Sequence, residues 1–366
     1  MRLELTPRRQ AGPFLNLAAP VLAVGFTAVV GAVLFAALGK PPLAALYAYF
    51  IEPLSEVWSL HELALKAAPL ILIAVGLSVC FRSNNWNIGA EGQLIVGAIF
   101  ASALPVLAPN ATGPWVLPLM LILAMVGGAL WAMIPAVLKN RFGTSEILVS
   151  LMLVYVAVLL LDYLVRGPWR NPEGFNFPES RSFGADALLP ELISTGAWGG
   201  RGNWGIVIAV AAAVFTTIML TRMLKGFEIK VGGASARAAR FAGFDARRTT
   251  FFVFLFSGAL AGLAGAVEVA GAIGQLRPSI SPGYGFTAII VAFLGRLHPI
   301  GIIAAGFLLA LSYLGGEAAQ ISIGLSDRMA QVFQGVLLFS VLASDTLVRY
   351  RVKLVVVRAQ ERVAHD

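Results

Sequence analysis

Long apolar runs, repeated along almost the whole chain, limit most strongly what this sequence can fold into. A helix needs about 20 apolar residues to cross a bilayer. Only 13% of the residues are charged and the mean hydropathy is +0.82, so a soluble core could not bury this many apolar side chains. The sequence predicts an all-α, polytopic membrane protein, one transmembrane domain over residues 1–366, with spans at 14–37, 63–80, 88–107, 115–138, 144–165, 204–222, 249–272, 284–296, 299–318 and 329–348.

Two of these runs begin at glycine-rich breaks. Gly89–Gln93 precedes the apolar letters LIVGAIFA, and Pro282–Phe286 precedes TAIIVAFLG. The run at 284–296 is too short to cross a bilayer straight. Transporters often carry interrupted helices at matching places in two halves, close to the substrate path. We therefore expect a short or broken helix in each half.

The basic residues predict the orientation. They gather at the N-terminus, in short turns after the second and fourth runs, in the segment 225–248 and in the C-terminal tail. Cytoplasmic loops carry such an excess of Lys and Arg, so both termini are predicted to be cytoplasmic. The segment 166–203 balances its charges and is rich in Gly, Pro and aromatic residues, which is typical of an irregular external loop. The net charge of +8 therefore indicates membrane topology and no nucleic-acid partner.

An unusually polar stretch, FRSNNWNIGAEGQ, lies between the second and third runs. One interpretation is a cytoplasmic turn, with Asn87 capping a helix and Glu91 in its first turn, where a negative charge is favoured. The other is a segment that lines or gates a polar path, because irregular backbone at membrane depth survives only inside protein or beside water. On that interpretation the path candidates here are Asn84, Asn85, Asn87, Glu91 and Gln93.

The seventh run adds one packing motif and one candidate carboxylate. Gly258 and Gly262 are four residues apart, a spacing that lets helices approach closely in lipid. Glu268 lies near the external end of this run, and an intramembrane carboxylate is a functional candidate. The alternative is an interfacial residue paired with Arg277. Tyr284, beside the second glycine-rich break, completes the candidates for a substrate path.

The segment 225–248 reads KGFEIKVGGASARAARFAGFDARR and is predicted to contain a short helix. Ser235 can cap its start and Gly243 can end it. Arg237 and Arg240 are three residues apart and share one face. Such a helix could be a basic segment touching anionic lipid, or a docking helix for a cytoplasmic partner.

At this segment the sequence resembles a family. GGASARAARFAGFDARR is similar to the coupling-loop motif of ABC-importer permeases of the branched-chain amino acid, simple-sugar and nucleoside group. NIGAEGQLIVGA, with KAAPLILIAVGLSVCFRSNNW before it, more narrowly resembles the nucleoside permeases that work with basic-membrane-lipoprotein-type binding proteins. The resemblance covers residues 14–347. Asn84, Asn85 and Trp86 depart from the small or apolar residues expected at those positions.

The resemblance implies a transport subunit of an importer in a bacterial cytoplasmic (inner) membrane, surrounded by lipid. Its partners would be a cytoplasmic ABC ATPase, a second permease that is homologous or identical, and an external substrate-binding protein. The solute would be a nucleoside, with a simple sugar or a branched-chain amino acid as alternatives. Contact with the ATPase would fall to Gly233, Ser235, Arg237, Ala238, Ala239, Arg240 and Gly243.

The residues agree with a subunit that is not an enzyme. The chain has no G-x-x-x-x-G-K-[ST] phosphate loop, so ATP is expected to bind a partner and no cofactor is expected here. Three His and one Cys are too sparse to predict a metal site, and no nucleophile–base pair stands out to predict a catalytic residue. An ion-driven secondary transporter remains the alternative from another class, with Glu91 and Glu268 as its coupling acids.

Overall fold

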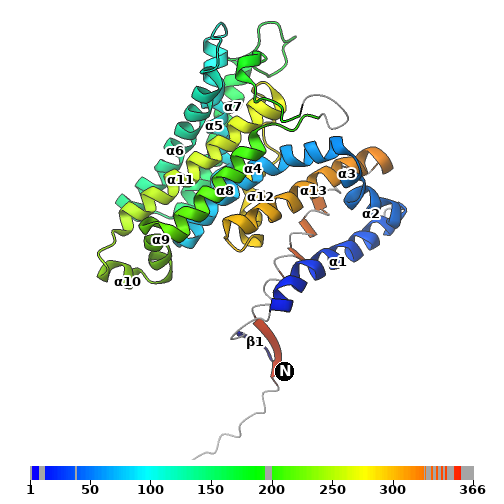
Figure 1. The fold of residues 1–366 in the computed structure, drawn as a ribbon, viewed down its shortest axis with the longest axis vertical. Coiled ribbons are helices and arrows are strands. Elements are labelled where there is room, and N and C mark those ends of the chain that lie inside the picture. The colour runs from blue at the N-terminus through cyan, green and yellow to red at the C-terminus, as the bar shows by residue number, and fades with distance from the viewer. Residues whose placement is uncertain are drawn as a thin grey trace, which may run out of the picture. The chain divides into compact units, whose positions relative to one another are not determined.

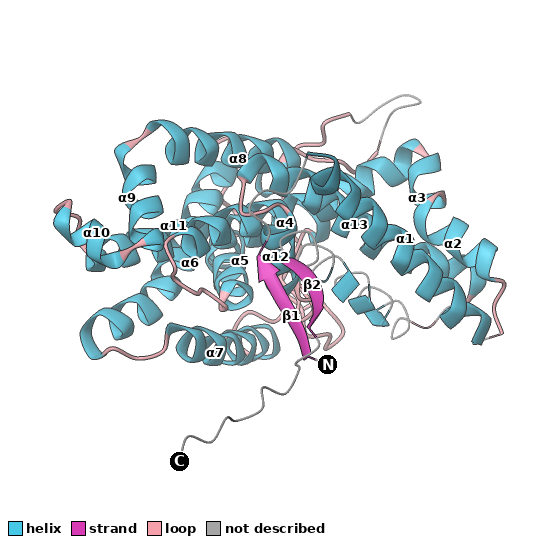
Figure 2. Cartoon of the chain, turned by 90° about the horizontal axis from the view of Figure 1, so that it is seen from below, coloured by secondary structure: helices cyan, strands magenta, loops and turns pink. Residues whose placement is uncertain are grey.

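The computed structural model describes residues 2–7, 13–37, 39–193, 200–324 and 326, parts of 331–343, and 350–355. In these ranges the chain is helical apart from one two-stranded sheet and its connecting loops (Figure 2). Seven of the described helices are long and apolar enough to cross a membrane. The prediction of an all-α polytopic membrane protein is therefore confirmed. The tenth predicted span, 329–348, lies outside the continuously described residues.

The chain forms two compact units, of which the first joins residues 1–49 to residues 316–366. It contains β1 (Arg2–Pro7), α1 (Pro13–Ala37), α2 (Pro42–Phe50) up to its last residue, and β2 (Tyr350–Val355). The two strands pair in antiparallel register from Arg2 opposite Val355 to Pro7 opposite Tyr350. This pairing places the two ends of the chain side by side. Whether the units belong to one domain stays a prediction.

The second unit, residues 50–315, contains the other long helices (Figure 1). The predicted runs agree with its long helices to within a few residues at most ends, and the run at 284–296 is indeed a short helix. Its elements are α3 (Glu52–Ser55), α4 (Val57–Arg82), α5 (Ala90–Leu107), α6 (Val116–Phe142), α7 (Glu146–Arg166), η1 (Ala185–Ala187), α8 (Gly205–Arg222), α9 (Leu224–Ala234), α10 (Ala236–Phe241), α11 (Ala246–Val267), the π-helical η2 (Glu268–Ile273), α12 (Tyr284–Leu294) and most of α13 (Pro299–Ile323).

Glycines hold three helices of the second unit at backbone contact. A Cβ atom added to Gly262 on α11 would lie 2.1 Å from the carbonyl oxygen of Ala124 on α6. One added to Gly97 on α5 would lie 2.2 Å from the Cα atom of Gly262. Neither position can hold a side chain without separating the helices. The predicted close packing by small residues is therefore confirmed, and it forms the core of the bundle.

In its described parts, 167–193 and 200–203, the segment after α7 is irregular apart from η1, as predicted, and it is bonded to η2 and to the residue after it. The amide of Leu189 donates to the carbonyl of Ala270 at 2.8 Å, and that of Phe183 donates to Gly274 at 2.8 Å. Beneath it, α11 continues as the π-helical turn η2. Figure 1 shows this segment at one end of the bundle and α10 at the other, which we call the α10 end.

Candidate functional site

The segment Ser83–Gly89, which we call the connector, joins α4 to α5 at the α10 end. The amides of Ser83 and Asn84 fold back onto the carbonyls of Cys80 and Phe81 and close the last turn of α4. Asn84 then takes a left-handed conformation with φ of 56°, which Asn tolerates better than most residues. The chain thereby leaves the helix axis and presents the next amide side chains to neighbouring helices.

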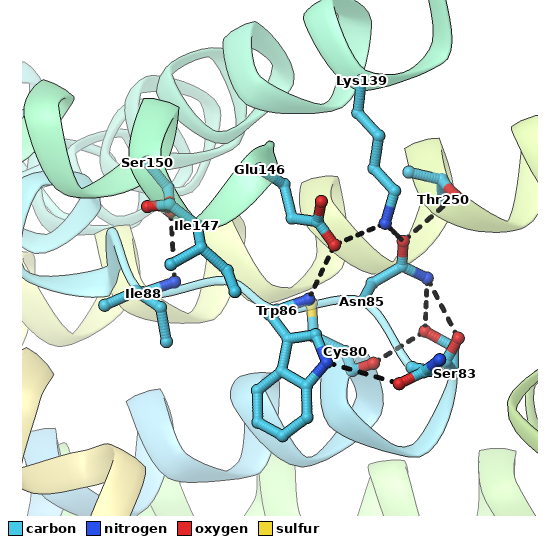
Figure 3. A network of polar contacts seen from close by, with 11 residues as sticks. Cys80, Ser83, Asn85, Trp86, Ile88, Lys139, Glu146, Ile147, Ser150 and Thr250 are labelled. Atoms are coloured by element: carbon cyan, nitrogen blue, oxygen red, sulfur yellow. Dashed lines mark hydrogen bonds and ion pairs between the residues drawn. The ribbon is translucent and has the colours of Figure 1, made fainter. Parts of the chain in front are cut away.

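Asn85 is buried at the centre of a network that ties three helices together (Figure 3). Its side-chain oxygen accepts from Lys139 at 2.9 Å and from Thr250 at 3.2 Å. Its side-chain nitrogen donates to the carbonyl and the hydroxyl of Ser83. An amide offers two acceptor and two donor positions, so Asn85 has every position engaged. It joins the end of α4 to α6 and α11.

The same network reaches α7. Lys139 on α6 lies 2.5 Å from a carboxylate oxygen of Glu146 at the start of α7. That oxygen also accepts from the backbone amide of Trp86 at 3.4 Å, and the amide of Ile88 donates to Ser150 at 3.2 Å (Figure 3). Irregular backbone of the connector is therefore bonded to side chains of a neighbouring helix, as a segment buried in protein requires.

Asn87 is fully buried and pairs with Gln93. Each of the two side chains donates to the other at 2.9 Å, and Asn87 also donates to Ser257 on α11 at 3.1 Å. The interpretation of Asn87 as the helix cap is wrong, because Gly89 holds the N-cap position of α5. Asn87 instead accepts the amide of Gly89 at 3.2 Å, which bends the chain just before the helix.

Glu91 lies in the first turn of α5, as expected, but its carboxylate serves a different helix. It accepts the backbone amide of Gly285, in the first turn of α12, at 2.6 Å. The Ser281 hydroxyl accepts the neighbouring amides of Gly283 and Tyr284, at 3.2 and 3.0 Å. A negative group at a helix N-terminus is stabilising, and backbone amides there need acceptors. The two glycine-rich breaks of the sequence therefore meet at Glu91.

Tyr284 begins α12 and packs against α13. Its ring meets the ring of Tyr313 edge to face, with 5.7 Å between centroids, and the Tyr313 hydroxyl bonds to Thr287 at 2.8 Å. Tyr284 is buried, so this short helix is fixed to α13 through aromatic contacts.

Glu268 lies away from the other candidates, at the start of η2. It is buried, and Lys66 and Glu62 on α4 are the charged groups that act on it. The alternative pairing with Arg277 is wrong, since Arg277 forms its ion pair with Glu179 at 3.7 Å. The seven path candidates therefore do not form one site: the connector residues and Gln93 form networks, Glu91 and Tyr284 hold α12, and Glu268 stands apart.

The predicted short helix is present as α10, between Ser235 and Gly243. The Ser235 hydroxyl accepts the amide of Ala238 at 3.3 Å and caps its start. Gly243 has φ of 79°, and the bonds from Gly243 to Arg240 and from Phe244 to Ala239 form a Schellman motif at its end. Both predicted capping signals are confirmed.

The exposed side of α10 carries the two arginines. Arg237, Ala238 and Arg240 are exposed, and Phe241 is 93% exposed, whereas Ala239 is buried against the bundle. Between α10 and the connector lies a cavity of about 230 Å³. Its polar wall includes Ser83, Asn85, Lys139 and Thr250, and its apolar wall includes Ala236 and Ala239. Among the described residues, no three His, Cys, Asp or Glu side chains gather closely enough to hold a metal.

Sequence reasoning missed the partners that hold the connector: Arg82, Lys139, Glu146, Thr250 and Ser257. A weak signal was available for two of them, since Lys139 and Glu146 flank a short turn at the same predicted membrane side as the connector. Nothing local distinguishes Thr250 or Ser257 from other hydroxyl residues of a membrane helix.

Comparison with known proteins places this chain among importer subunits. The family described as "Branched-chain amino acid transport system / permease component" matches residues 59–342. The glucose ABC transporter permease protein TsgB13 of Haloferax volcanii is 37% identical, over 96% of this chain and 94% of the relative. The nucleoside permease NupB of Lactococcus lactis and the guanosine permease NupP of Bacillus subtilis are each 29% identical, over 87% and 92% of this chain and 89% and 95% of their own lengths.

Proposed function

We propose that this chain, which belongs to the branched-chain amino acid transport system permease family, carries a neutral solute containing a sugar ring into the cell. As a member of that family it is the non-enzymatic membrane subunit of an ABC importer. Transport proceeds by alternating access, with ATP bound and hydrolysed by a partner chain. A nucleoside is the first candidate solute, and a free sugar is the second.

The observation that carries the coupling role is the geometry of α10. It is a capped, rigid helix with two exposed arginines and an exposed Phe241, held at the end of the bundle between α9 and α11. An exposed aromatic side chain flanked by arginines is typical of an interface hot spot. We assign ATPase contact to the exposed residues Ser235, Arg237, Ala238, Arg240 and Gly243. Gly233 and Ala239 pack against the bundle instead and hold this helix in place.

The α10 end is then cytoplasmic, and the segment 166–203 faces outward to receive an external binding protein. The pairing of β1 with β2 supports termini on one side of the membrane. The exposed apolar side chains of α7, which include Tyr155, Leu159 and Tyr163, suit lipid or a second permease subunit. That second subunit is homologous or identical to this chain.

Two observations bear on the solute. The polar stretch NIGAEGQ favours a nucleoside, and relatives named for nucleoside and guanosine transport match nearly the whole chain. The 37% identity to a permease named for glucose favours a free sugar. A ribose or hexose ring is common to both, and hydroxyl groups are recognised by amides and carboxylates of the kind found here.

Uptake by the assembled transporter tests the solute. The chain is purified with its ATPase and permease partners, reconstituted in vesicles, and supplied with its binding protein and either labelled guanosine or labelled glucose. We expect ATP-dependent uptake of guanosine that excess glucose does not reduce. Uptake of glucose alone identifies the sugar branch, and uptake driven by an ion gradient without ATP contradicts the importer mechanism.

A charge reversal tests the coupling helix. The double variant Arg237→Glu/Arg240→Glu should insert and fold normally, because both side chains are exposed, but should lose most of its ATP-driven uptake or release the ATPase. Arg141→Glu, at an exposed arginine near the end of α6, is the control that keeps uptake. Normal uptake by the double variant would show that the ATPase docks elsewhere.

A further inference from the structure

The segment α9–α10, which we call the coupling segment, touches the end of α4 through backbone at Gly233. A Cβ atom added to Gly233 would lie 1.9 Å from the carbonyl oxygen of Arg82, at the end of α4. The neighbouring Gly232 has open space, with nothing within 4 Å of the same added atom. Only a glycine fits at position 233, so α9 rests directly on the end of α4 there.

The 230 Å³ cavity separates α10 from the connector beside this contact. Ala236 and Ala239 line it from the side of α10, and Ser83 and Asn84 line it from the side of the connector. Close-packed contacts transmit displacement, whereas a cavity absorbs it. A movement of α9 and α10 therefore reaches the end of α4 at Arg82, and it reaches the start of α11 through the bond between Thr249 and Glu228.

Arg82 and its neighbours hold the C-terminal end of α12. The Nε atom of Arg82 donates to the carbonyl of Leu297 at 2.9 Å, just after the helix. The ring of Phe81 stacks on Phe293 with 5.2 Å between centroids, and Trp86 stacks on the same ring at 6.2 Å. The last turn of α12 is thus attached to the end of α4 and to the connector.

Glu91 holds the N-terminal end of the same helix. Its carboxylate accepts the Gly285 amide, and a Cβ atom added to Gly285 would lie 2.2 Å from the backbone nitrogen of Glu91. The segment from Phe81 to Glu91 therefore contacts both ends of α12. Between these attachments, Asn85 and Asn87 are bonded to α6 and α11, which makes the segment stiff.

We propose that residues 81–91 are a rigid link that moves α12 together with the coupling segment. Arg82 and Glu91 are its positioning residues, and this role rests on the proposed ATPase coupling. With 11 residues, α12 is about 16 Å long, roughly half of the 30 Å hydrocarbon core. Half-length helices border substrate sites in other transporters. Displacement of such a helix would change whether the substrate path beside it opens to the cytoplasm or to the outside.

Hydrogen exchange followed by mass spectrometry tests the link without knowing the solute. The transporter, assembled with its ATPase in lipid nanodiscs, is compared with and without Mg-ATP. We expect ATP to change amide exchange in both α9–α10 and α12. In Gly233→Ala the change in α12 should fall about fivefold or more, while the change in α9–α10 remains. Gly232→Ala is the matched control and should behave as the unaltered chain.

Paired substitutions at the two attachments keep the test decisive if Gly233→Ala fails to fold. Glu91→Leu and Arg82→Met should lose the change in α12. Glu91→Gln keeps an acceptor and Arg82→Lys keeps a donor, so these two variants should retain the ATP-induced change in α12 exchange. An equal α12 response in Gly233→Ala and Gly232→Ala, or in Glu91→Leu and Glu91→Gln, overturns the link. A chain that retains no ATPase at all contradicts the proposed function instead.

Discussion

The connector and the coupling segment α9–α10 lie at the same end of the bundle and are both rich in polar residues, yet the structure uses them differently. In the connector, Asn85 and Asn87 are buried and every amide position of Asn85 is bonded within the chain. In α10, Arg237 and Arg240 project outward, and caps at both ends hold the helix. Buried polar groups fix geometry here, whereas exposed ones are available to a partner.

The largest effect on stability is expected when the buried hydrogen bonds of the connector are removed. Asn87→Leu would leave Gln93, Ser257 and the Gly89 amide without their partner. Each buried polar group left unsatisfied costs about 1–3 kcal/mol, so with three such groups we expect the free energy of unfolding to fall by about 3 kcal/mol or more. Thermal unfolding in detergent measures it. Asn84→Gly, at an exposed position nearby, keeps the left-handed backbone and is the control; an equal loss in both would contradict the network.

Removing the cation of the connector network should have the next largest effect. Lys139→Met removes the cationic donor of the Glu146 carboxylate and the Asn85 oxygen, which keep only the Trp86 amide and the Thr250 hydroxyl as donors. Because both charged side chains are partly exposed, the loss should be about 1–3 kcal/mol, less than for a fully buried pair. Unfolding measured beside Arg166→Met, which removes an exposed ion pair with Asp162, should show the smaller change in the control. If Arg166→Met lost more stability than Lys139→Met, the Lys139 contacts would contribute less than an exposed ion pair, which contradicts this prediction.

On the exposed side, the end of α10 can be disturbed without touching the bundle. Gly243→Ala forces a side chain into a left-handed conformation at a cost of about 1–2 kcal/mol, localised to the coupling helix. We expect faster amide exchange in α10 and reduced ATP-driven uptake, with the unfolding temperature of the bundle unchanged. Gly232→Ala, in open space, should change neither quantity. A drop in bundle stability would show that α10 is part of the core.

The start of α10 should give the smallest effect. Ser235→Ala removes the hydroxyl that accepts the Ala238 amide, and loss of such a cap costs about 1 kcal/mol. Ser235→Asp keeps an acceptor and should restore the helix. Exchange of the Ala238 amide and the rate of uptake check both variants. If the two variants exchange alike, the cap contributes nothing and the Schellman motif alone holds α10.

Features set by neighbours in the sequence could be predicted. The length of each apolar run predicts most of the membrane helices, and Ser235 with Gly243 predicts both ends of α10, because a cap bonds only within its own turn. The helices α2, α3 and α9 were missed. The first two are too short to give a membrane signal, and α9 carries charges and two glycines that weaken a helical pattern.

The candidate site could be predicted only in part, because its partners are distant in sequence. Asn85 bonds to Thr250, 165 residues away, and Asn87 bonds to Ser257, 170 residues away. Glu91 meets Gly285 across 194 residues. No local pattern encodes such pairs. The polar stretch could therefore be recognised as buried or path-lining, while its actual task, holding α12 and tying α4 to α6, α7 and α11, required the tertiary structure.

The pairing of β1 with β2 bears on how the protein is made. Residues 2–7 are synthesised long before their strand partner, residues 350–355. The ladder can therefore close only after every membrane helix has been produced. A chain truncated before Tyr350 would keep an unpaired strand at its N-terminus, an edge that can recruit other chains. Closure of this small sheet thus requires that the whole stretch from residue 2 to residue 355 has been made, which a chain terminated within that stretch cannot meet.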